Sequence, residues 1–161
     1  VPTLPDFRLE THFSKWEFKA QYHLTASDAE SLSLRDLLDG ASAEERASLE
    51  DLWLGYTETF GAPDLREAIA ETYEAQAAEN VLCFAGASEG IFAANQVVLD
   101  ADSHAIVVTP NYQSHETLPL AICEATGVPL DPEDSWSLDI DRVRAAVRPN
   151  TQLSSRLRIR A

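Results

Sequence analysis

NVLCFAGASEGIFAANQVVL, residues 80–99, is the stretch that says most about the fold of this chain. It opens with a short apolar run, residues 81–84, which is too short for a helix and rich in strand-forming side chains, so it predicts a buried strand. A turn of small residues, 85–88, comes next, and beyond Ser88 apolar and small side chains recur at helical spacing. We therefore expect a strand, a tight turn and a helix, residues 88–99, that packs against a sheet.

The small residues of this turn leave the backbone N–H groups of Gly86, Ala87 and Ser88 open where the helix begins. Such N–H groups and the helix dipole favour an anion, and the hydroxyl of Ser88 can cap the helix or bind a phosphate. A plain tight turn between a strand and a helix explains the same residues, because such turns are common in α/β proteins. The stretch alone leaves both interpretations open.

The composition limits the possible partners. The chain has 161 residues, of which 45% are hydrophobic, and this suffices for one domain with a core. Its 27 acidic and 12 basic residues give a formal net charge of −15. Nucleic acids and anionic membrane surfaces require a basic protein surface, so we expect neither as a partner. A single phosphate is compatible with this charge, since backbone amides can bind an anion locally.

Cys83 and Cys123 are the only cysteines, and both lie in apolar or helical patterns, which indicates buried free thiols and a cytoplasmic setting. No apolar run approaches membrane-spanning length, the N-terminus lacks a signal-peptide pattern, and no metal-binding set is predicted. The chain contains no methionine, even at its first position, so we expect it to be processed or to be a piece of a longer protein.

Upstream of residue 80, two prolines indicate an extended arm over residues 1–10, and helical spacing of apolar residues predicts the helices that follow. Gly40 suits the end of one helix and Pro63 the first turn of another. The helices are expected over residues 12–20, 33–39, 43–54 and from 63 to about 80.

Downstream, strands and helices alternate. A second apolar run, residues 105–109, predicts a strand, and a helix over residues 113–125 should follow, kinked or delayed by Pro119. Further along we expect an edge strand at 127–130, a helix capped by Asp139 and a strand from 151 to 155. This order predicts an α/β fold with a mostly parallel sheet and flanking helices. The arginine-rich end, residues 154–161, indicates either an exposed edge strand or a departure from the original reading frame.

Several pieces occur in an order that is specific where each piece alone is not. Together they resemble the N-terminal half of a class I/II aminotransferase, a fold type I pyridoxal-phosphate enzyme, over residues 50–153. A weaker resemblance, over residues 15–38, is to the capreomycidine-synthase-like subgroup. The pieces of the first resemblance are Gly55-Tyr56, Gly61, residues 64–70, residues 86–90 and residues 107–112.

The resemblance implies a domain organisation. Residues 1–44 would form an N-terminal helical arm and a small-domain segment. Residues 45–161 would form a truncated pyridoxal-phosphate-binding large domain, with its α/β sheet.

The resemblance also implies a site. Gly86, Ala87 and Ser88 match the turn that binds the cofactor phosphate, and Tyr112 matches the aromatic residue that stacks on the pyridine ring. Ligands of open α/β sheets bind at the carboxyl ends of the strands, where Tyr112 is expected. The alternative for Tyr112 is a turn tyrosine without a ligand.

Two further residues match family positions. His115 resembles the histidine that braces the aspartate paired with the pyridine nitrogen, although a surface helix histidine is the alternative. Tyr56 resembles the loop tyrosine that reaches the cofactor phosphate of a neighbouring subunit, which would make the protein a homodimer; the alternative is a partly buried core tyrosine.

The chain departs from the family pattern by what it lacks. A transaminase needs a lysine that holds the cofactor and moves protons, but the only lysines are Lys15 and Lys19, neither in the family motif. The Asn-Pro-x-Gly loop, the aspartate for the pyridine nitrogen and the arginine for the substrate carboxylate are also missing. We therefore assign no catalytic residue and expect a truncated copy that is inactive alone.

The expected function is amino-group transfer between an amino acid and a 2-oxo acid, in a full-length enzyme with pyridoxal 5'-phosphate. One alternative on the same scaffold is elimination or cyclisation of an amino acid, as in the capreomycidine-synthase type. Another is a non-catalytic acidic α/β domain that binds nothing or only a phosphate.

Overall fold

The computed structural model describes residues 4–25 and 29–155. The chain divides into two compact units, one formed by residues 20–83 and the other by residues 1–19 together with 84–161. Each unit is described by itself.

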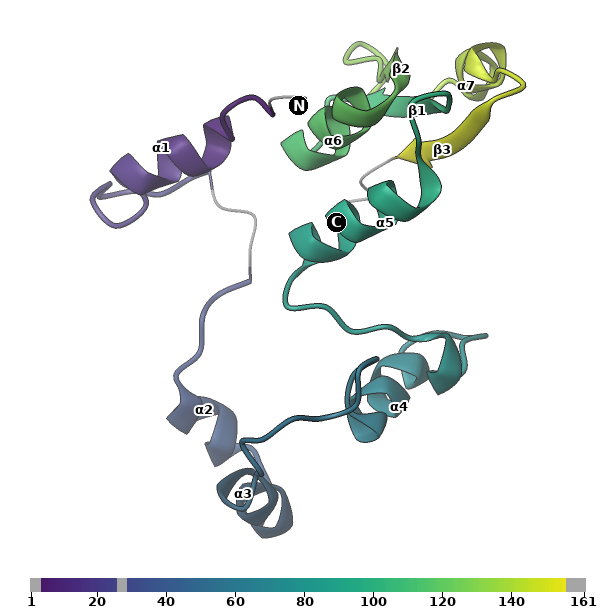
Figure 1. Cartoon of the computed structure of the whole chain (residues 1–161). Helices are drawn as coiled ribbons and strands as arrows, with labels where there is room; N and C mark the ends of the chain where they lie inside the picture. The colour runs from purple at the N-terminus through teal and green to yellow at the C-terminus, as the bar shows by residue number, and fades with distance from the viewer. Residues whose placement is uncertain (1–3, 26–28, 156–161) are drawn as a thin grey trace. The chain divides into compact units, whose positions relative to one another are not determined.

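The second of these units, which we call the sheet unit, contains a three-stranded parallel sheet in the order β2-β1-β3 (Figure 1). This confirms the predicted α/β class with its parallel sheet. The elements of the sheet unit are α1 (Arg8–Trp16), α5 (Ala87–Val98), β1 (His104–Thr109), α6 (Gln113–Ile122), β2 (Glu124–Pro129), α7 (Ile140–Ala146) and β3 (Thr151–Ser155).

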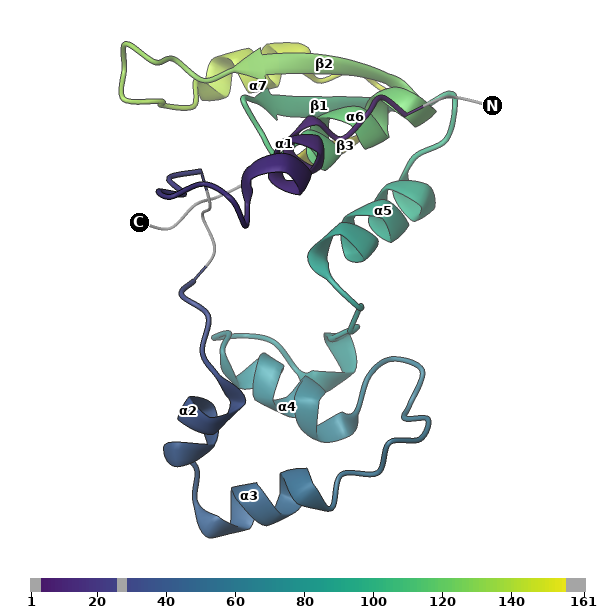
Figure 2. The same cartoon turned by 90° about the vertical axis from the view of Figure 1, so that its left-hand side faces the viewer.

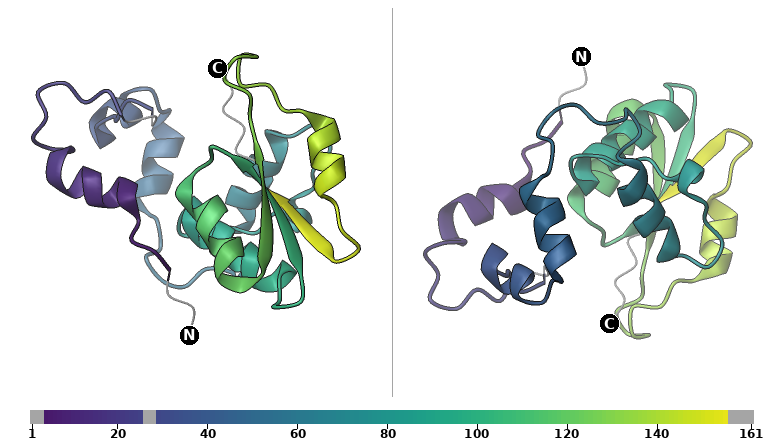
Figure 3. Two further views of the ribbon diagram at one scale, coloured as in Figure 1. Left: turned by 90° about the horizontal axis from the view of Figure 1, so that it is seen from above. Right: turned by 90° about the horizontal axis from the view of Figure 1, so that it is seen from below.

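The core of the sheet unit is β1. Residues 104–108 are all buried, and the strand pairs with β2 on one side and β3 on the other. The chain steps from β1 outward to β2 and then back across β1 to β3. Right-handed crossovers therefore place α6 and α7 on opposite faces of the sheet, as Figure 3 shows. The predicted strand over 105–109 is confirmed.

The other downstream elements also follow the predicted pattern, with shifted ends. Helix α6 begins at Gln113 and holds Pro119 in its interior, but it ends at Ile122 because β2 begins two residues later. Asp139 caps α7, since its carboxylate accepts the N–H groups of Asp141 and Arg142 at 2.9 and 3.2 Å.

The unit formed by residues 20–83 is helical. Helices α2 and α3 each begin with a capping box, built by Ser33 with Asp36 and by Ser42 with Glu45. The elements are α2 (Leu34–Asp39), α3 (Ala43–Glu50), α4 (Pro63–Glu71) and the short 3₁₀ helix η1 (Ala78–Asn80).

Two helices of this unit are shorter than predicted. The predictions to residue 54 and to about residue 80 were wrong at their C-terminal ends, since α3 ends at Glu50 and α4 at Glu71. The apolar residues Leu52 and Trp53 suggested a longer α3, but both are exposed. Without a buried face, the apolar spacing stabilises no further helical turn.

The predicted buried strand over residues 81–84 was also wrong. The segment forms no strand in the described chain, and Leu82 and Phe84 are exposed by 51% and 43%. Val81, which follows η1, is extended, and the N–H of Cys83 donates to the carbonyl of Phe60 at 2.9 Å. A strand exists only by pairing with a neighbour, and no described residue pairs with this segment as a strand.

The N-terminal arm is extended only as far as Phe7, because α1 begins at Arg8 rather than at His12. The arginine-rich end beyond Ser155, at residues 156–161, lies outside the described residues. Within the described ranges, no helix has both the length and the apolar character needed to cross a membrane.

Candidate functional site

The turn before α5 has the backbone that its small residues suggest. Gly86 is the N-cap residue, with φ +133° and ψ 155°, a conformation that side-chain-bearing residues rarely adopt. At the start of the helix the Gly90 N–H donates to the Gly86 carbonyl at 3.3 Å, and the N–H groups of Ala87 and Ser88 precede this bond. No side chain caps the helix. Ser88 therefore does not serve as the cap that was one of its two predicted roles.

An acidic side chain also lies at this turn. The carboxylate of Glu89 accepts the N–H of Ala85 at 2.7 Å. This bond holds the turn closed from the helix side, and it places a negative charge near the helix N-terminus. An anion bound here would depend on the remaining backbone N–H groups and the helix dipole rather than on a basic side chain.

Tyr112 lies where the chain leaves β1 and enters α6. It is the N-cap residue of α6 and is half-buried. The Asn111 side chain accepts the Tyr112 N–H at 2.8 Å, while the Asn111 N–H donates to the Glu116 carboxylate at 2.8 Å. These bonds fix the turn and hence the position of the tyrosine ring. The ring of Phe7, from the N-terminal arm, lies against it at a centroid distance of 5.3 Å and an interplanar angle of 56°.

The structure brings Ser88 and Tyr112 to one cavity of about 430 Å³. Ser114 also lines this cavity; its hydroxyl is buried and has no hydrogen-bond partner within the described part of the chain. Sequence reasoning missed Ser114, which lies inside a helix without a motif. The remaining lining residues are Leu4, Pro5, Phe7, Glu10, Phe92, Thr117 and Leu118.

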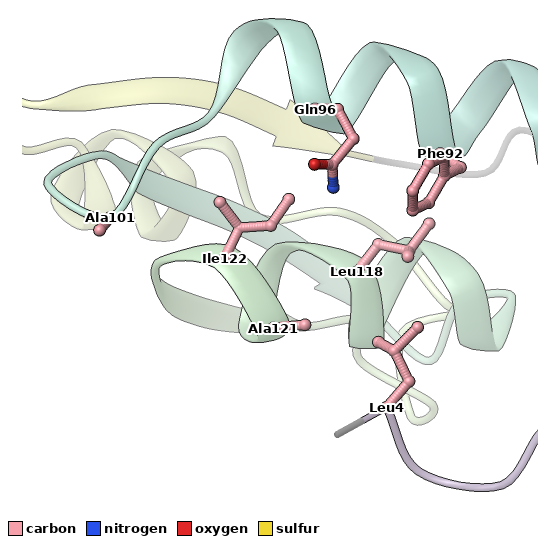
Figure 4. Close-up of a pocket in the computed structure, with 7 residues that line it drawn as sticks. All are labelled: Leu4, Phe92, Gln96, Ala101, Leu118, Ala121 and Ile122. Carbon is pink, nitrogen blue, oxygen red and sulfur yellow. The ribbon is translucent and has the colours of Figure 1, made fainter. Parts of the chain in front are cut away.

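A second cavity, of about 400 Å³, lies between α5 and α6 (Figure 4). It shares Leu4, Phe92 and Leu118 with the first cavity, and its lining is otherwise formed by Gln96, Ala101, Ala121 and Ile122. The second cavity is therefore mostly apolar, with Gln96 as its polar lining residue, whereas the first cavity, at Ser88 and Tyr112, has more polar lining residues.

His115 is half-buried on α6, and its Nδ1 atom lies 2.6 Å from the hydroxyl of Ser155 at the end of β3. Burial lowers the pKa of His115. The side chain thus has a hydrogen-bond partner in the sheet unit, which distinguishes it from the surface helix histidine that was its alternative.

Tyr56 belongs to the unit formed by residues 20–83, and its side chain is fully exposed. It is not the partly buried core tyrosine that was the alternative. It lines an open cavity of about 570 Å³ together with Leu52, Trp53 and Thr57.

A buried histidine that sequence reasoning missed lies at the amino end of the sheet. His104 is 0% exposed, and its two ring nitrogens lie 2.8 Å from the hydroxyls of Thr151 and Thr126. Arg148, which pairs with Glu124 at 2.7 Å, adds a hydrogen bond to the Thr126 hydroxyl at 3.4 Å. Because both ring nitrogens have partners in the core, this cluster joins the three strands and leaves no atom for a ligand.

Known proteins resemble this chain in sequence. The profile of the family described as "Aminotransferase class I and II" matches residues 21–157. The chain belongs to this family. It is 29% identical to the aspartate aminotransferase of Pyrococcus horikoshii over 114 residues, which cover 67% of this chain and 29% of that protein. It is 31% identical to a probable aspartate/prephenate aminotransferase of Thermus aquaticus over 106 residues, which cover 60% of this chain and 27% of that protein.

Solved structures share the fold. A PLP-dependent aminotransferase from Streptococcus suis matches 94% of this chain and 42% of its own, with a TM-score of 0.85 at 24% identity. The aspartate aminotransferase from Thermus thermophilus with maleate matches 93% of this chain and 41% of its own, with a TM-score of 0.76 at 24% identity. The fold is thus that of the fold type I large domain. The chain spans less than a third of the length of the curated relatives named above.

Pyridoxal phosphate is the cofactor of this family. The residues at the first cavity fit such a group in chemistry: backbone N–H groups of Ala87 and Ser88 for a phosphate, and an aromatic face at Tyr112 for a flat ring. A methyl group added at Gly86 would meet nothing within 4 Å, so the turn is open where a phosphate would approach.

The Gly86→Ala variant tests the backbone of the turn. Space is available for the added methyl group, so the whole effect should come from the positive φ, at a cost of about 1–3 kcal/mol in the free energy of unfolding. Gly127→Ala is the matched control, because a methyl group there also meets nothing within 4 Å but the backbone φ lies outside that region. Urea denaturation measures both, and equal effects in the two variants would contradict the assigned strain.

His115 should make the stability depend on pH. Its folded pKa lies below the ordinary value of 6.5 because burial disfavours the charged ring. The unfolded chain therefore binds more protons in that range, so the contribution is present above pH 6.5 and is lost as the pH falls through the folded pKa. His115→Gln should flatten the pH dependence of the free energy of unfolding in that range. An unchanged slope in His115→Gln would refute the assignment.

Proposed function

We propose that these 161 residues form the N-terminal part of a pyridoxal-phosphate-dependent aminotransferase that moves an amino group between an amino acid and a 2-oxo acid. The observation that carries the proposal is the shared cavity: Ser88 at the start of α5 and Tyr112 at the start of α6 line it together. Family membership over residues 21–157 and the lengths of the relatives support the proposal.

Each residue has a proposed role. The N–H groups of Ala87 and Ser88 and the Ser88 hydroxyl bind the phosphate, and Gly86 gives the backbone access to it. Tyr112 packs against the ring and orients it. His115 has its Nδ1 atom 2.6 Å from the Ser155 hydroxyl, and burial, which lowers its pKa, favours the neutral ring; we propose that it braces the group that pairs with the pyridine nitrogen. When bound, the cofactor ring withdraws electrons from the substrate's α-carbon.

We propose two parts for the chain, as the resemblance implies. Residues 1–44 form the N-terminal arm and a small-domain segment, and residues 45–161 form part of the large domain. Free thiols at Cys83 and Cys123 support a cytoplasmic setting.

We also propose that the protein is a homodimer in which Tyr56 reaches the cofactor phosphate of the partner subunit. The full exposure of its side chain supports this role, because the hydroxyl is available to a second copy. Sedimentation velocity tests the assembly, and a monomer at every concentration would contradict it.

No lysine other than Lys15 and Lys19 is present, so the chain should lack the group that holds the cofactor covalently and carries the proton. We expect no transaminase turnover from these residues alone, since loss of such a group costs several orders of magnitude in rate. Borohydride reduction and peptide mapping test this. A stoichiometric pyridoxyl adduct on Lys15 or Lys19, together with turnover, would show that the chain is a working enzyme.

The cavity itself is tested by equilibrium dialysis with pyridoxal phosphate. The wild-type chain should bind it weakly, pyridoxal without the phosphate should bind more weakly still, and Tyr112→Ala should reduce the affinity by about three- to tenfold through the lost ring contact. Tyr73→Ala is the control, because Tyr73 is exposed and belongs to the other unit. If Tyr112→Ala and Tyr73→Ala bind alike, the ring is not at the proposed place.

A further inference from the structure

A glutamine side chain joins the N-terminal arm to α6. The amide of Gln113 donates from Nε2 to the carbonyl of Asp6 at 2.8 Å, and its Oε1 accepts the N–H of Arg8 at 2.9 Å. The arm groups belong to residues that are 107 and 105 positions away in the sequence. A primary amide offers one donor face and one acceptor face, so it pairs with the arm backbone as a neighbouring peptide would.

The acceptor half of this pairing also caps a helix. Phe7, the N-cap residue of α1, makes no side-chain cap bond, and Arg8 is the first residue of that helix. The first N–H groups of a helix have no partner within it. Gln113 therefore provides from α6 the cap that the sequence around Phe7 lacks, and it fixes the point at which the arm changes from extended chain to helix.

The residue between the two bonded positions is Phe7. Because the backbone is held on both sides of it, its ring is directed at Tyr112, with the centroids 5.3 Å apart. Leu4, Pro5 and Phe7 line the same cavity as Tyr112. Figures 1 and 2 show the arm running beside α6. The arm is thus one side of the cavity.

We propose that Gln113 is a positioning residue that holds the arm, residues 4–10, as a detachable wall of the ring-binding cavity. The role of the cavity rests on the function proposed above. The clamp, by which we mean the two hydrogen bonds from Gln113 to Asp6 and Arg8, does not rest on it.

The geometry indicates that the arm lines the cavity and does not fill it. A cavity of about 430 Å³ remains with the arm in place, and it is lined by Phe7 and Tyr112 together. The two rings are tilted by 56° rather than stacked in parallel, so Phe7 does not cover the tyrosine as a flat ligand would. A bound ring would therefore touch the arm, and binding of the ring and docking of the arm should stabilise each other.

Limited digestion with trypsin measures docking of the arm, because Arg8 is a cleavage site within it. Gln113→Leu removes both hydrogen bonds at similar volume and should speed cleavage after Arg8 by about five- to tenfold, since proteolysis follows the population of the open form. Gln113→Glu keeps the acceptor for the Arg8 N–H and loses the donor to Asp6. Its rate of cleavage after Arg8 should therefore lie between those of the wild type and Gln113→Leu. Gln76→Leu, at an exposed position of the other unit, is the matched control.

Cleavage after Arg35 and Arg46 is the internal reference, and the ratio to these sites separates opening of the arm from loss of the fold. If Gln113→Leu is cleaved after Arg8 at the same rate relative to these two sites as the wild type is, the clamp does not hold the arm.

Addition of pyridoxal phosphate then tests whether the arm forms one side of the occupied cavity. It should slow cleavage after Arg8 in the wild type, and Gln113→Leu should bind it several-fold more weakly by dialysis. Only the Arg8 site is scored, since reaction of the aldehyde with Lys15 or Lys19 would block trypsin there. If dialysis shows binding but the cofactor leaves cleavage after Arg8 unchanged or speeds it, the arm does not form a wall of the occupied cavity. Absence of binding in every variant overturns the proposed function and leaves the clamp to be judged on the digestion alone.

Discussion

The sheet unit depends on one strand, His104–Thr109, which is buried from His104 to Val108 and hydrogen-bonded on both sides. A parallel strand in that position needs cover on both faces, and the crossovers through α6 and α7 supply it. The same topology separates the two ends of the sheet. The amino end holds His104 between two threonine hydroxyls in a closed network, while the carboxyl end turns through Asn111 and Tyr112 into α6 and remains open to a cavity.

Elements with a strong local signal could be predicted from the sequence. The apolar run at 105–109, the Asp139 cap and the Pro63 helix start are set by neighbours in the chain, and the structure has all three. Residues 81–84 carry an equally good strand pattern but do not pair, because pairing depends on a neighbouring strand rather than on the segment itself. Helix ends at Glu50 and Glu71 were misjudged for the same reason, since apolar spacing continues where no packing partner exists.

The residues of the candidate site likewise fall into those that could be predicted from the sequence and those that could not. Ser88 and Tyr112 could be proposed from the sequence because each lies in a local motif, but it is the packing of α5 against α6 that brings them to one cavity, since residues 81–84 form no strand of the sheet. Phe7, Gln113 and Ser114 could not, because their importance comes from contacts or burial that no local pattern encodes. The apolar residues of the arm were the available signal: Phe7 is half-buried against Tyr112, although Leu4 is 51% exposed.

The charge distribution explains why such a site would need help from other groups. Glu89 lies at the turn and Glu10 at the cavity, whereas no lysine or arginine of residues 4–25 and 29–155 lines it. Among the described residues, a phosphate dianion would therefore be met by backbone N–H groups, a hydroxyl and the dipole of α5, in a chain of formal net charge −15. Such neutral groups orient an anion well but compensate its charge incompletely, and one aromatic contact adds little more. Orientation of the ring can thus come from the residues around this cavity, whereas charge compensation and covalent attachment must come from groups that do not line it. Under the function proposed above, a lysine in the family's motif would be such a group, because an amine can carry a positive charge and form a covalent bond, whereas Tyr56 of a second copy would add only a further hydrogen bond.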